Sequence, residues 1–388
     1  MLEIFHNETP ESAIVIIFKA FRRFRLCVWK YCNDYNRNMP ETPEDFVQTL
    51  SVNLKQDKFE TSNDIAKFLV NILVNLIKHR DWKTAQDLLC ILRSEGQKMI
   101  KLDPTETAIG NIVRRILKIV RDDYISVECG RQIEGDSDSL QKMLLSKEDT
   151  IGTYTKYFPN LKERILESID EFERELDLNT ENIAAQALEH IHSGEVILTA
   201  GKSQTVEAFL KKAAAKRTFH VIVVELAPFY TGHELARSLA KANIKTTLIP
   251  DSAVFAMMPR VNKVIIGTHS VMANGGLKAQ CGVHAVALAA KHYSVPLIVC
   301  APVFKLTPQY LCSEDQEGFN KFVSPEKVIG FETGAILNDV ELVNPVFDYV
   351  PPDLVPLFVF NIGGNAPSYV YRLLSELYHP DDYFLTGN

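Results

Sequence analysis

Residues 196–224 read VILTAGKSQTVEAFLKKAAAKRTFHVIVV, in which two short β-branched runs flank a segment of helical composition. The alternation continues with three further runs, TTLI at 246–249, KVIIG at 263–267 and LIVC at 297–300. Runs that are apolar on both faces and separated by crossovers of about 15–30 residues are typical of a parallel sheet covered by helices on both sides. We therefore expect a C-terminal, Rossmann-like α/β domain with a doubly wound parallel sheet over residues 193–388.

The first half of the chain has a different, helical period. Apolar residues recur three or four positions apart, as in Ile65, Leu69 and Ile72, which is the pattern of one buried helix face. We therefore expect an all-helical N-terminal domain over residues 1–192. Its later helices are expected at 108–126, 161–178 and 180–191. The polar, glycine-containing stretch 128–158 interrupts the pattern and is expected to be a mobile surface insertion.

The charge of the chain argues against two classes of partner. Its 388 residues carry 42 Lys and Arg against 49 Asp and Glu, a formal net charge of −7. Residues 1–194 hold 26 of these cations and 32 of the anions, so the excess of acid lies mainly in the helical half. Nucleic acids and anionic membranes attract clustered Lys and Arg. We therefore expect no direct binding of nucleic acid and none of a membrane.

The cysteines and the apolar runs indicate a cellular compartment. Seven cysteines, an odd number without a CxxC pair, predict neither a disulfide framework nor a zinc ribbon. No apolar run approaches the roughly 20 residues that a membrane-spanning helix needs, and no signal peptide is recognisable. We therefore expect a cytosolic protein.

The ends of the expected strands are where ligands bind in sheets of this kind. The first strand ends in TAGKS at 199–203, where a helix start is an anion site in principle. The GxGxxG and Walker patterns are absent, and a plain turn capped by Ser203 is the favoured interpretation. The other strand ends offer single titratable groups, namely Glu225, Asp251, His269 and Cys300. Acid–base chemistry needs a convergent pair, so the sequence indicates no catalytic residue, no cofactor and no metal centre.

Long runs of the sequence resemble a known family. They are VILTAGKSQTVEAFL (196–210), VIVVELAPFYTGHELARSLAKANIKTTLIPDSAVFAMM (221–258), VNKVIIGTHSVMANGG (261–276) and PLIVCAPVFKL (296–306). On these runs the chain resembles the family that joins the regulatory subunits of eukaryotic translation initiation factor 2B to the methylthioribose-1-phosphate isomerases. The stretch NIGGNAPSYVYRLLSELYHPDDY (361–383) is most similar to the beta-type branch.

The isomerase branch of the family provides a test of function. The resemblance implies a catalytic cysteine after the first strand, an arginine after the second, an aspartate after the fourth and an Asn-Lys pair after the NG turn. This chain has other residues there, namely Gly201, Ala227, His269, Ala279 and Gln280. Without a proton carrier and a phosphate clamp, an isomerase loses acid–base catalysis and electrostatic stabilisation. The resemblance thus implies a pseudoenzyme. The alternative is a sugar-phosphate isomerase or sugar-phosphate-binding module that uses Lys202 and Ser203.

The resemblance also implies a regulatory role in translation initiation. Members of the regulatory branch belong to a decameric guanine nucleotide exchange factor that contains alpha, beta, gamma, delta and epsilon subunits. The complex acts on the GTPase that delivers initiator tRNA, and its largest subunit catalyses exchange. The alpha, beta and delta subunits sense phosphorylation of the GTPase's alpha subunit. The implied partners of this chain are the alpha, gamma, delta and epsilon subunits and the GTPase heterotrimer.

An acidic helix is the candidate surface for the GTPase. Residues 160–178 place apolar side chains on one helical face and align Glu163, Glu167 and Glu171 along another. Like charges four residues apart destabilise a helix by roughly 0.2–0.5 kcal/mol per pair, and a basic partner would relieve that repulsion. A solvated helix face is the simpler alternative. The resemblance favours Glu167 and Glu171, with Arg164 beside them, as contacts of the GTPase's alpha subunit.

Two expected strands are candidates for contact with other subunits. His220 and Ile222 share one face of the first of them, and Thr247 and Ile249 share one face of the second. Burial under a covering helix is the alternative, especially for Ile222. The resemblance favours a subunit interface at these four residues.

A helix near the C-terminus is rich in tyrosine. Exposed tyrosines at helical spacing are typical of contacts between subunits. We expect Tyr371 to be buried, and Tyr369 or Tyr378 to make such a contact.

Overall fold

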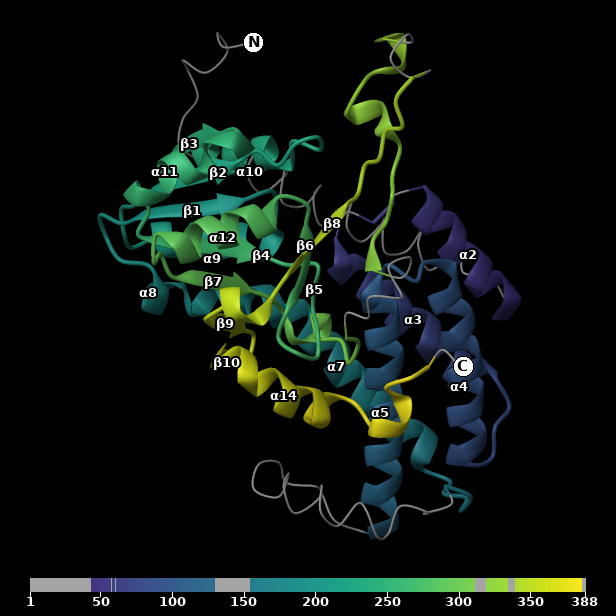
Figure 1. Ribbon diagram of the computed structural model, residues 1–388. Helices are drawn as coiled ribbons and strands as arrows, with labels where there is room; N and C mark the ends of the chain where they lie inside the picture. Colours follow the sequence, from purple (N-terminus) through teal and green to yellow (C-terminus); the bar gives the residue numbers. More distant parts are fainter. Residues whose placement is uncertain are drawn as a thin grey trace, which may run out of the picture. The chain divides into compact units, whose positions relative to one another are not determined.

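The architecture is that of a computed structural model (Figure 1), which describes residues 43–56, 58–59, 61–129, 154–310, 319–333 and 339–385. Contacts divide the chain into two units, Met1–Gln56 and Asp57–Asn388. The described helix of the first unit is α2, Pro43–Lys55. The other described elements belong to the second unit.

The second unit begins with a group of helices. They are α3 (Ser62–His79), α4 (Ala85–Leu102), α5 (Thr107–Cys129), α7 (Leu161–Ala185) and α8 (Ala187–His190). Capping boxes start two of them, because Thr61 and Asp64 satisfy each other's backbone N–H groups at α3, and Thr84 and Asp87 do so at α4. Helices α3, α4 and α5 lie side by side (Figure 1) and bury their apolar faces against one another. The helical half is therefore confirmed.

A seven-stranded sheet follows, in the order β10-β9-β7-β4-β1-β2-β3. Its strands are β1 (Val196–Ala200), β2 (His220–Val224), β3 (Lys245–Ile249), β4 (Lys263–Gly267), β7 (Leu297–Cys300), β9 (Leu357–Phe360) and β10 (Gly363–Asn365). All neighbours pair in parallel except β9 and β10. The five runs quoted from the sequence thus form adjacent parallel strands, as predicted.

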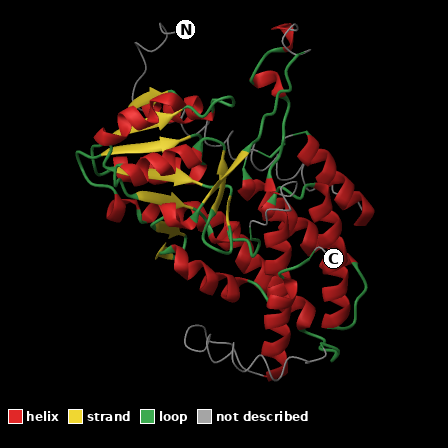
Figure 2. Ribbon diagram, viewed as in Figure 1, coloured by secondary structure: helices red, strands yellow, loops and turns green. Residues whose placement is uncertain are grey.

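Helices cover both faces of this sheet (Figure 2). On one face lie α9 (Gln204–Ala214), α10 (Thr231–Lys241) and the end of α7. On the other lie α11 (Val254–Met257), α12 (Val283–His292) and α14 (Val370–Leu377). Successive strand residues point to opposite faces of the sheet. Ile197 therefore packs in the hydrophobic core on one face and Leu198 in the core on the other. The doubly wound α/β architecture is therefore confirmed.

A second, smaller sheet was not predicted. It is antiparallel, in the order β5-β6-β8, and consists of β5 (Ser270–Val271), β6 (Leu277–Gln280) and β8 (Phe347–Val350). Short 3-10 turns connect several elements, at Asp251–Ala253, Met258–Arg260, Val303–Lys305, Pro325–Lys327, Phe331–Thr333, Pro352–Leu354, Pro367–Tyr369 and Pro380–Asp382. No helix in the described ranges is both long enough and apolar enough to cross a membrane.

Some predicted boundaries are wrong. Helix α7 continues through Leu178–Thr180, where we expected a break, because Asn179 is buried and the apolar face runs on to Ile183. The expected insertion is also too long at both ends, since its first residues belong to α5 and Tyr154 and Phe158 pack edge-on against Tyr124. Residues 130–153 lie outside the described part of the chain. The division into domains at residue 192 stays a prediction.

Candidate functional site

A cleft lies at the carboxyl ends of the parallel strands. Its volume is about 350 Å³, and residues that follow β1, β4 and β7 line it together with the starts of α3 and α9. Strand β1 pairs with β2 on one side and with β4 on the other, so the strand order reverses at this place. Ligands of doubly wound sheets bind at such reversals, which makes the cleft the candidate site.

Gly201 stands between two cleft-lining residues, Ala200 and Lys202, at the position where a cysteine was implied for the isomerases. Its φ is +62°, a left-handed conformation that side chains rarely adopt. A Cβ atom there would lie 2.8 Å from Gln280 Oε1 and 2.8 Å from Leu226 Cδ1. The backbone and its neighbours therefore leave no room for a side chain at this position.

Three other positions implied for the isomerases, Ala227, Ala279 and Gln280, hold no proton carrier either. Ala227 donates its backbone N–H to Asp251 Oδ2 at 2.7 Å, and Ala279 is fully buried. Gln280 lies beside the cleft and accepts a hydrogen bond from Thr231 Oγ1 at 3.3 Å. These residues contribute packing and neutral polar contacts.

His269 does have a charged neighbour, which the sequence analysis missed. Its Nε2 lies 3.5 Å from Glu106 Oε1, and its ring packs on Phe347 with 4.5 Å between ring centroids. Burial lowers the pKa of His269, although Glu106 opposes that shift. Glu106 precedes α5, far from His269 in sequence, so no local pattern signals the pair. The expectation that His269 stands alone is therefore wrong.

Two buried lysines stand near this pair. Lys278 Nζ donates to the Thr105 carbonyl at 2.6 Å, and Lys305 Nζ donates to the Thr268 carbonyl at 2.9 Å. Burial lowers the pKa of each to about 8, and Glu106 opposes the shift in both. Each lysine lies between apolar residues in the sequence, as in LKA and VFKL. That placement was the sequence signal from which their burial could have been predicted.

The thiols near the strands are not activated. Burial raises the pKa of Cys300 to about 12. The pKa of Cys281 rises to about 11, because of burial and the nearby Asp348 carboxylate. A nucleophilic thiol needs a lowered pKa. In the described ranges, no group of three or more His, Cys, Asp and Glu is arranged to hold a metal ion.

The remaining titratable strand-end residues are also engaged. Glu225 Oε2 lies 3.1 Å from His233 Nε2, away from the cleft-lining residues. Asp251 accepts the backbone N–H groups of Leu226 and Ala227. Lys202 pairs with Glu234 at 2.7 Å, and Ser203 caps α9 by accepting the Val206 N–H. The plain capped turn expected at Ser203 is therefore confirmed.

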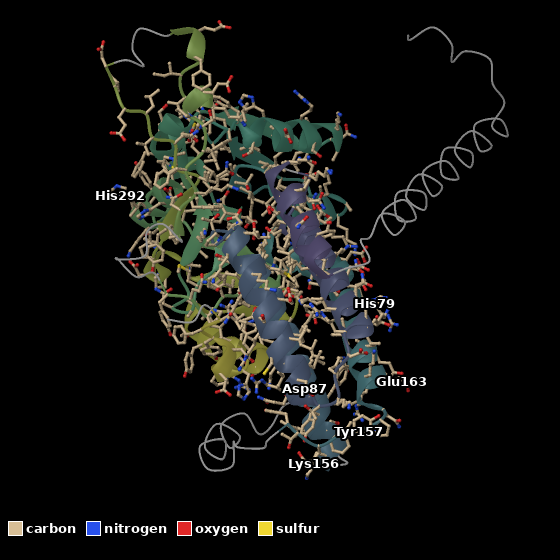
Figure 3. The ribbon with its side chains drawn as sticks, turned by 90° about the vertical axis from the view of Figure 1, so that its right-hand side faces the viewer. His79, Asp87, Lys156, Tyr157, Glu163 and His292 are labelled. Carbon is tan, nitrogen blue, oxygen red and sulfur yellow. The ribbon has the colours of Figure 1, made fainter. Side chains whose placement is uncertain are left out.

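The acidic ridge of α7 has the expected exposure. Glu163, Glu167 and Glu171 are all exposed, and Figure 3 shows Glu163 near the end of the helical part. Arg164 instead faces α5, where its Nη2 donates to Ser126 Oγ at 2.8 Å. Burial raises the pKa of the α5 residue Asp123 to about 6, and Glu171 contributes to the shift. The ridge therefore presents carboxylates, while Arg164 braces the helix.

The four strand residues assigned to a subunit interface differ in accessibility. His220 Nε2 and Thr247 Oγ1 are 2.8 Å apart, and both side chains are partly exposed. Burial and the nearby Lys245 lower the pKa of His220. Ile222 and Ile249 are buried in the core between the sheet and its covering helices. Their assignment to an interface is wrong, because they offer no surface to a partner.

The C-terminal tyrosines also differ from expectation. Tyr371 is 56% exposed, whereas Tyr378 is fully buried and donates its hydroxyl to the Leu306 carbonyl at 2.7 Å. The predicted burial of Tyr371 is therefore wrong, as is the contact offered for Tyr378. Tyr369 is partly buried beneath the Arg372 guanidinium, 5.4 Å from its ring centroid.

Comparison with known proteins gives a consistent assignment. The model of the initiation factor 2 subunit family matches residues 58–367. Translation initiation factor eIF2B subunit beta of Dictyostelium discoideum is 42% identical over 373 residues, which cover 86% of this chain and 95% of that protein. Ribose 1,5-bisphosphate isomerase of Archaeoglobus fulgidus is 32% identical over 190 residues, but these cover 48% of this chain and 58% of the isomerase.

A solved structure agrees with these relatives. The crystal structure of the tetrameric eIF2B-beta2-delta2 complex from C. thermophilum superposes with a TM-score of 0.66 at 26% identity, covering 87% of this chain and 96% of that one. The family match spans both the helical part and the α/β part. The chain belongs to the initiation factor 2 subunit family.

Proposed function

We propose that the chain is a beta-type regulatory subunit of an eIF2B guanine nucleotide exchange complex and has no catalytic activity of its own. The extent of the likeness supports this role, since the match to an eIF2B beta subunit covers 95% of that protein. The match to an isomerase covers little more than half of the isomerase. Exchange catalysis then lies in another subunit.

Gly201 is the observation that carries the non-catalytic part of the proposal. A Cβ atom at this position would lie within 2.8 Å of Gln280 and Leu226, so position 201 has no room for the cysteine that the resemblance implies for the isomerases. The thiols of Cys281 and Cys300 are protonated near neutral pH, because their pKa values are about 11 and 12. General acid–base catalysis contributes about 10²–10⁴-fold in rate, and neither position 201 nor these two thiols supplies a group for it.

One observation favours a second candidate function. His269 lines the cleft and its Nε2 lies 3.5 Å from Glu106 Oε1, an arrangement that would serve as an acid–base couple in a sugar-phosphate isomerase. The residues that line the cleft include no carboxylate and no thiol beside His269. A direct assay of turnover separates the two functions.

Assembly with related subunits is part of the proposed function. A solved relative is a complex of two beta and two delta subunits, and we extend this to partners of the alpha, gamma and epsilon types. The partly exposed pair of His220 and Thr247 is the proposed contact, with Tyr369 as a second one. A hydroxyl and an imidazole joined by a hydrogen bond suit the polar rim of an interface.

Binding of the GTPase is assigned to α7. Glu167 and Glu171 are exposed on one ridge, and their repulsion falls when a basic surface approaches. We assign this surface to the alpha subunit of the initiation GTPase, whose phosphorylation it would sense. Arg164 holds the helix to α5 through Ser126.

The assembly proposal is tested by native mass measurement of the full chain, alone and with a delta-type subunit. We expect a complex that contains both subunits. Thr247→Arg should reduce its fraction, because the added side chain fills the contact surface. Thr246→Arg is the matched control, since neighbouring strand residues point to opposite faces. A chain that ignores the delta-type subunit, or equal effects of the two variants, would contradict the proposal.

A further inference from the structure

The lysines and arginines of one segment of the chain have no part in the proposed function. Residues 202–245 contain eight Lys and Arg against three Asp and Glu, in a chain of net charge −7. They lie on and around α9 and α10, which cover the same face of the main sheet. An open groove of about 650 Å³ runs between the two helices.

The carboxylates in this groove are already paired. Lys202 Nζ lies 2.7 Å from Glu234 Oε2, and Lys211 Nζ lies 2.6 Å from Glu207 Oε1. Ser238 also donates its hydroxyl to Glu207 at 2.5 Å. Burial opposes ionisation of Glu207, but the hydrogen bonds from Lys211 and Ser238 outweigh it, so its pKa lies below the ordinary value. Both carboxylates thus stay ionised and hold α9 to α10.

Two further cations of the groove have no such pairing. Arg237 and Lys241 are exposed and line the groove from α10. Neither makes an ion pair with a carboxylate in the part of the chain that the structure describes. Four residues apart on one helix, they project from the same side and stand about 6 Å apart along the axis.

We propose that the groove between α9 and α10 binds an extended acidic peptide segment of a partner protein, with Arg237 and Lys241 as its anion contacts. The spacing supports this occupant, because alternate side chains of an extended strand repeat every 6.4–6.8 Å or so, about the separation of the two cations. Acidic residues at alternate positions would therefore meet both in register. The proposal does not depend on the identity of the exchange complex.

The chemistry of the groove favours a polypeptide over a nucleic acid. Glu207 and Glu234 line the groove and would repel a continuous phosphate backbone. No aromatic side chain is among the residues that line it, so it lacks a platform for stacking bases, on which single-stranded nucleic acids depend. An acidic peptide can place neutral residues beside the two carboxylates.

The test measures binding of a fluorescein-labelled peptide of alternating Glu and Ser to the full chain by fluorescence anisotropy. A peptide of alternating Gln and Ser and a polyuridine RNA serve as comparison probes. The variant Arg237→Glu/Lys241→Glu reverses the charge of both proposed anion contacts. Its matched control is Lys212→Glu/Lys216→Glu, which makes the same change in net charge at exposed residues outside the groove. Circular dichroism verifies that both variants fold.

We expect saturable binding of the acidic peptide that weakens as salt increases. The groove variant should lose at least about tenfold in affinity for the acidic peptide, and the control variant less than about threefold. The difference is expected because direct ion pairs contribute more to affinity than the long-range electrostatic attraction of the whole protein. Equal losses in the two variants would overturn the proposal. So would binding of the Gln peptide as tight as that of the Glu peptide, tighter binding of the RNA, or no saturable binding of the acidic peptide.

Discussion

Arg121 of α5 donates its Nε–H to Asp382 Oδ2 at 3.1 Å, across 261 residues of sequence, and both side chains are almost fully buried. Arg93 of α4 joins the same carboxylate at 2.6 Å. Arg114 donates to the backbone carbonyl of Asp382. The Asp382 carboxylate therefore binds the C-terminal segment to helices α4 and α5 through Arg93 and Arg121.

We predict that Asp382→Asn lowers the free energy of unfolding by about 3–5 kcal/mol, since breaking a buried pair leaves charges without compensation. Asp381→Asn, at a neighbouring carboxylate that is 65% exposed, should cost less than about 1 kcal/mol. Urea denaturation of both variants checks the difference. Similar losses in the two would show that the buried pairing contributes little.

Gly201→Ala tests the lack of room for a side chain at position 201. The added Cβ meets both a strained φ and atoms 2.8 Å away, so we expect a loss of about 2–4 kcal/mol. Gly194→Ala provides the matched control, because Gly194 has φ +84° but no atom within 4 Å of the added Cβ. Its loss should be about 1–2 kcal/mol. Urea denaturation measures both, and equal losses would mean that position 201 can accommodate a side chain.

Lys278 predicts a particular dependence of stability on pH. Burial lowers its pKa from 10.5 in the unfolded chain to about 8 in the fold. Between these values the unfolded state binds a proton that the folded state lacks, so this group makes stability rise with pH. Below pH 8 both states are protonated and the cost of burying the charge is present in full.

Lys278→Met removes that cost. The stability of the variant relative to the parent should therefore be most favourable near pH 7. It should decline by up to about 3 kcal/mol as pH rises to 10.5. Urea denaturation at several pH values measures this trend. Lys321→Met, at a side chain that is 47% exposed, should change by less than about 1 kcal/mol over the same range. A constant difference for Lys278→Met would contradict the burial of its charge.

Glu171→Lys tests the assigned surface for the GTPase. The change replaces an exposed carboxylate, so we expect normal folding and at least about tenfold weaker capture of the GTPase's alpha subunit. Glu181→Lys makes the same change at an exposed residue about 15 Å further along α7. Affinity measured by biolayer interferometry should be retained in this control. Unchanged affinity in Glu171→Lys would remove the assignment.

Much of the fold was predictable because its signals are local. Each central strand is a β-branched run that fills both faces of the sheet, as Ile197 and Leu198 do, and such runs can be recognised without a partner. Strands β5, β6, β8, β9 and β10 escaped prediction. Strand β5 has two residues, β10 reads GGN and β8 contains Asp348 and Tyr349, so neither period nor composition distinguishes these three from loops. Strand β9, by contrast, is the apolar run LFVF and carries the same signal as the predicted strands.

The site was less predictable because its contacts are distant in sequence. Glu106 and His269 meet only when α5 packs beside the end of β4, and nothing near either residue signals the other. The burial of Tyr378 was not predictable for the same reason. Its hydroxyl donates to the carbonyl of Leu306, which is distant in sequence, and helical spacing does not indicate that contact. By contrast, the resemblance alone identified the residues that stand at the implied isomerase positions, namely Gly201, Ala227, His269, Ala279 and Gln280.

The central claim is that the cleft is inert and that the outer surfaces perform the function. It is tested most directly by incubating the purified full chain with methylthioribose 1-phosphate or ribose 1,5-bisphosphate and following the product by nuclear magnetic resonance. We predict no conversion above that in buffer, and the same result for His269→Ala. Conversion by the parent chain that is lost in His269→Ala would contradict the claim.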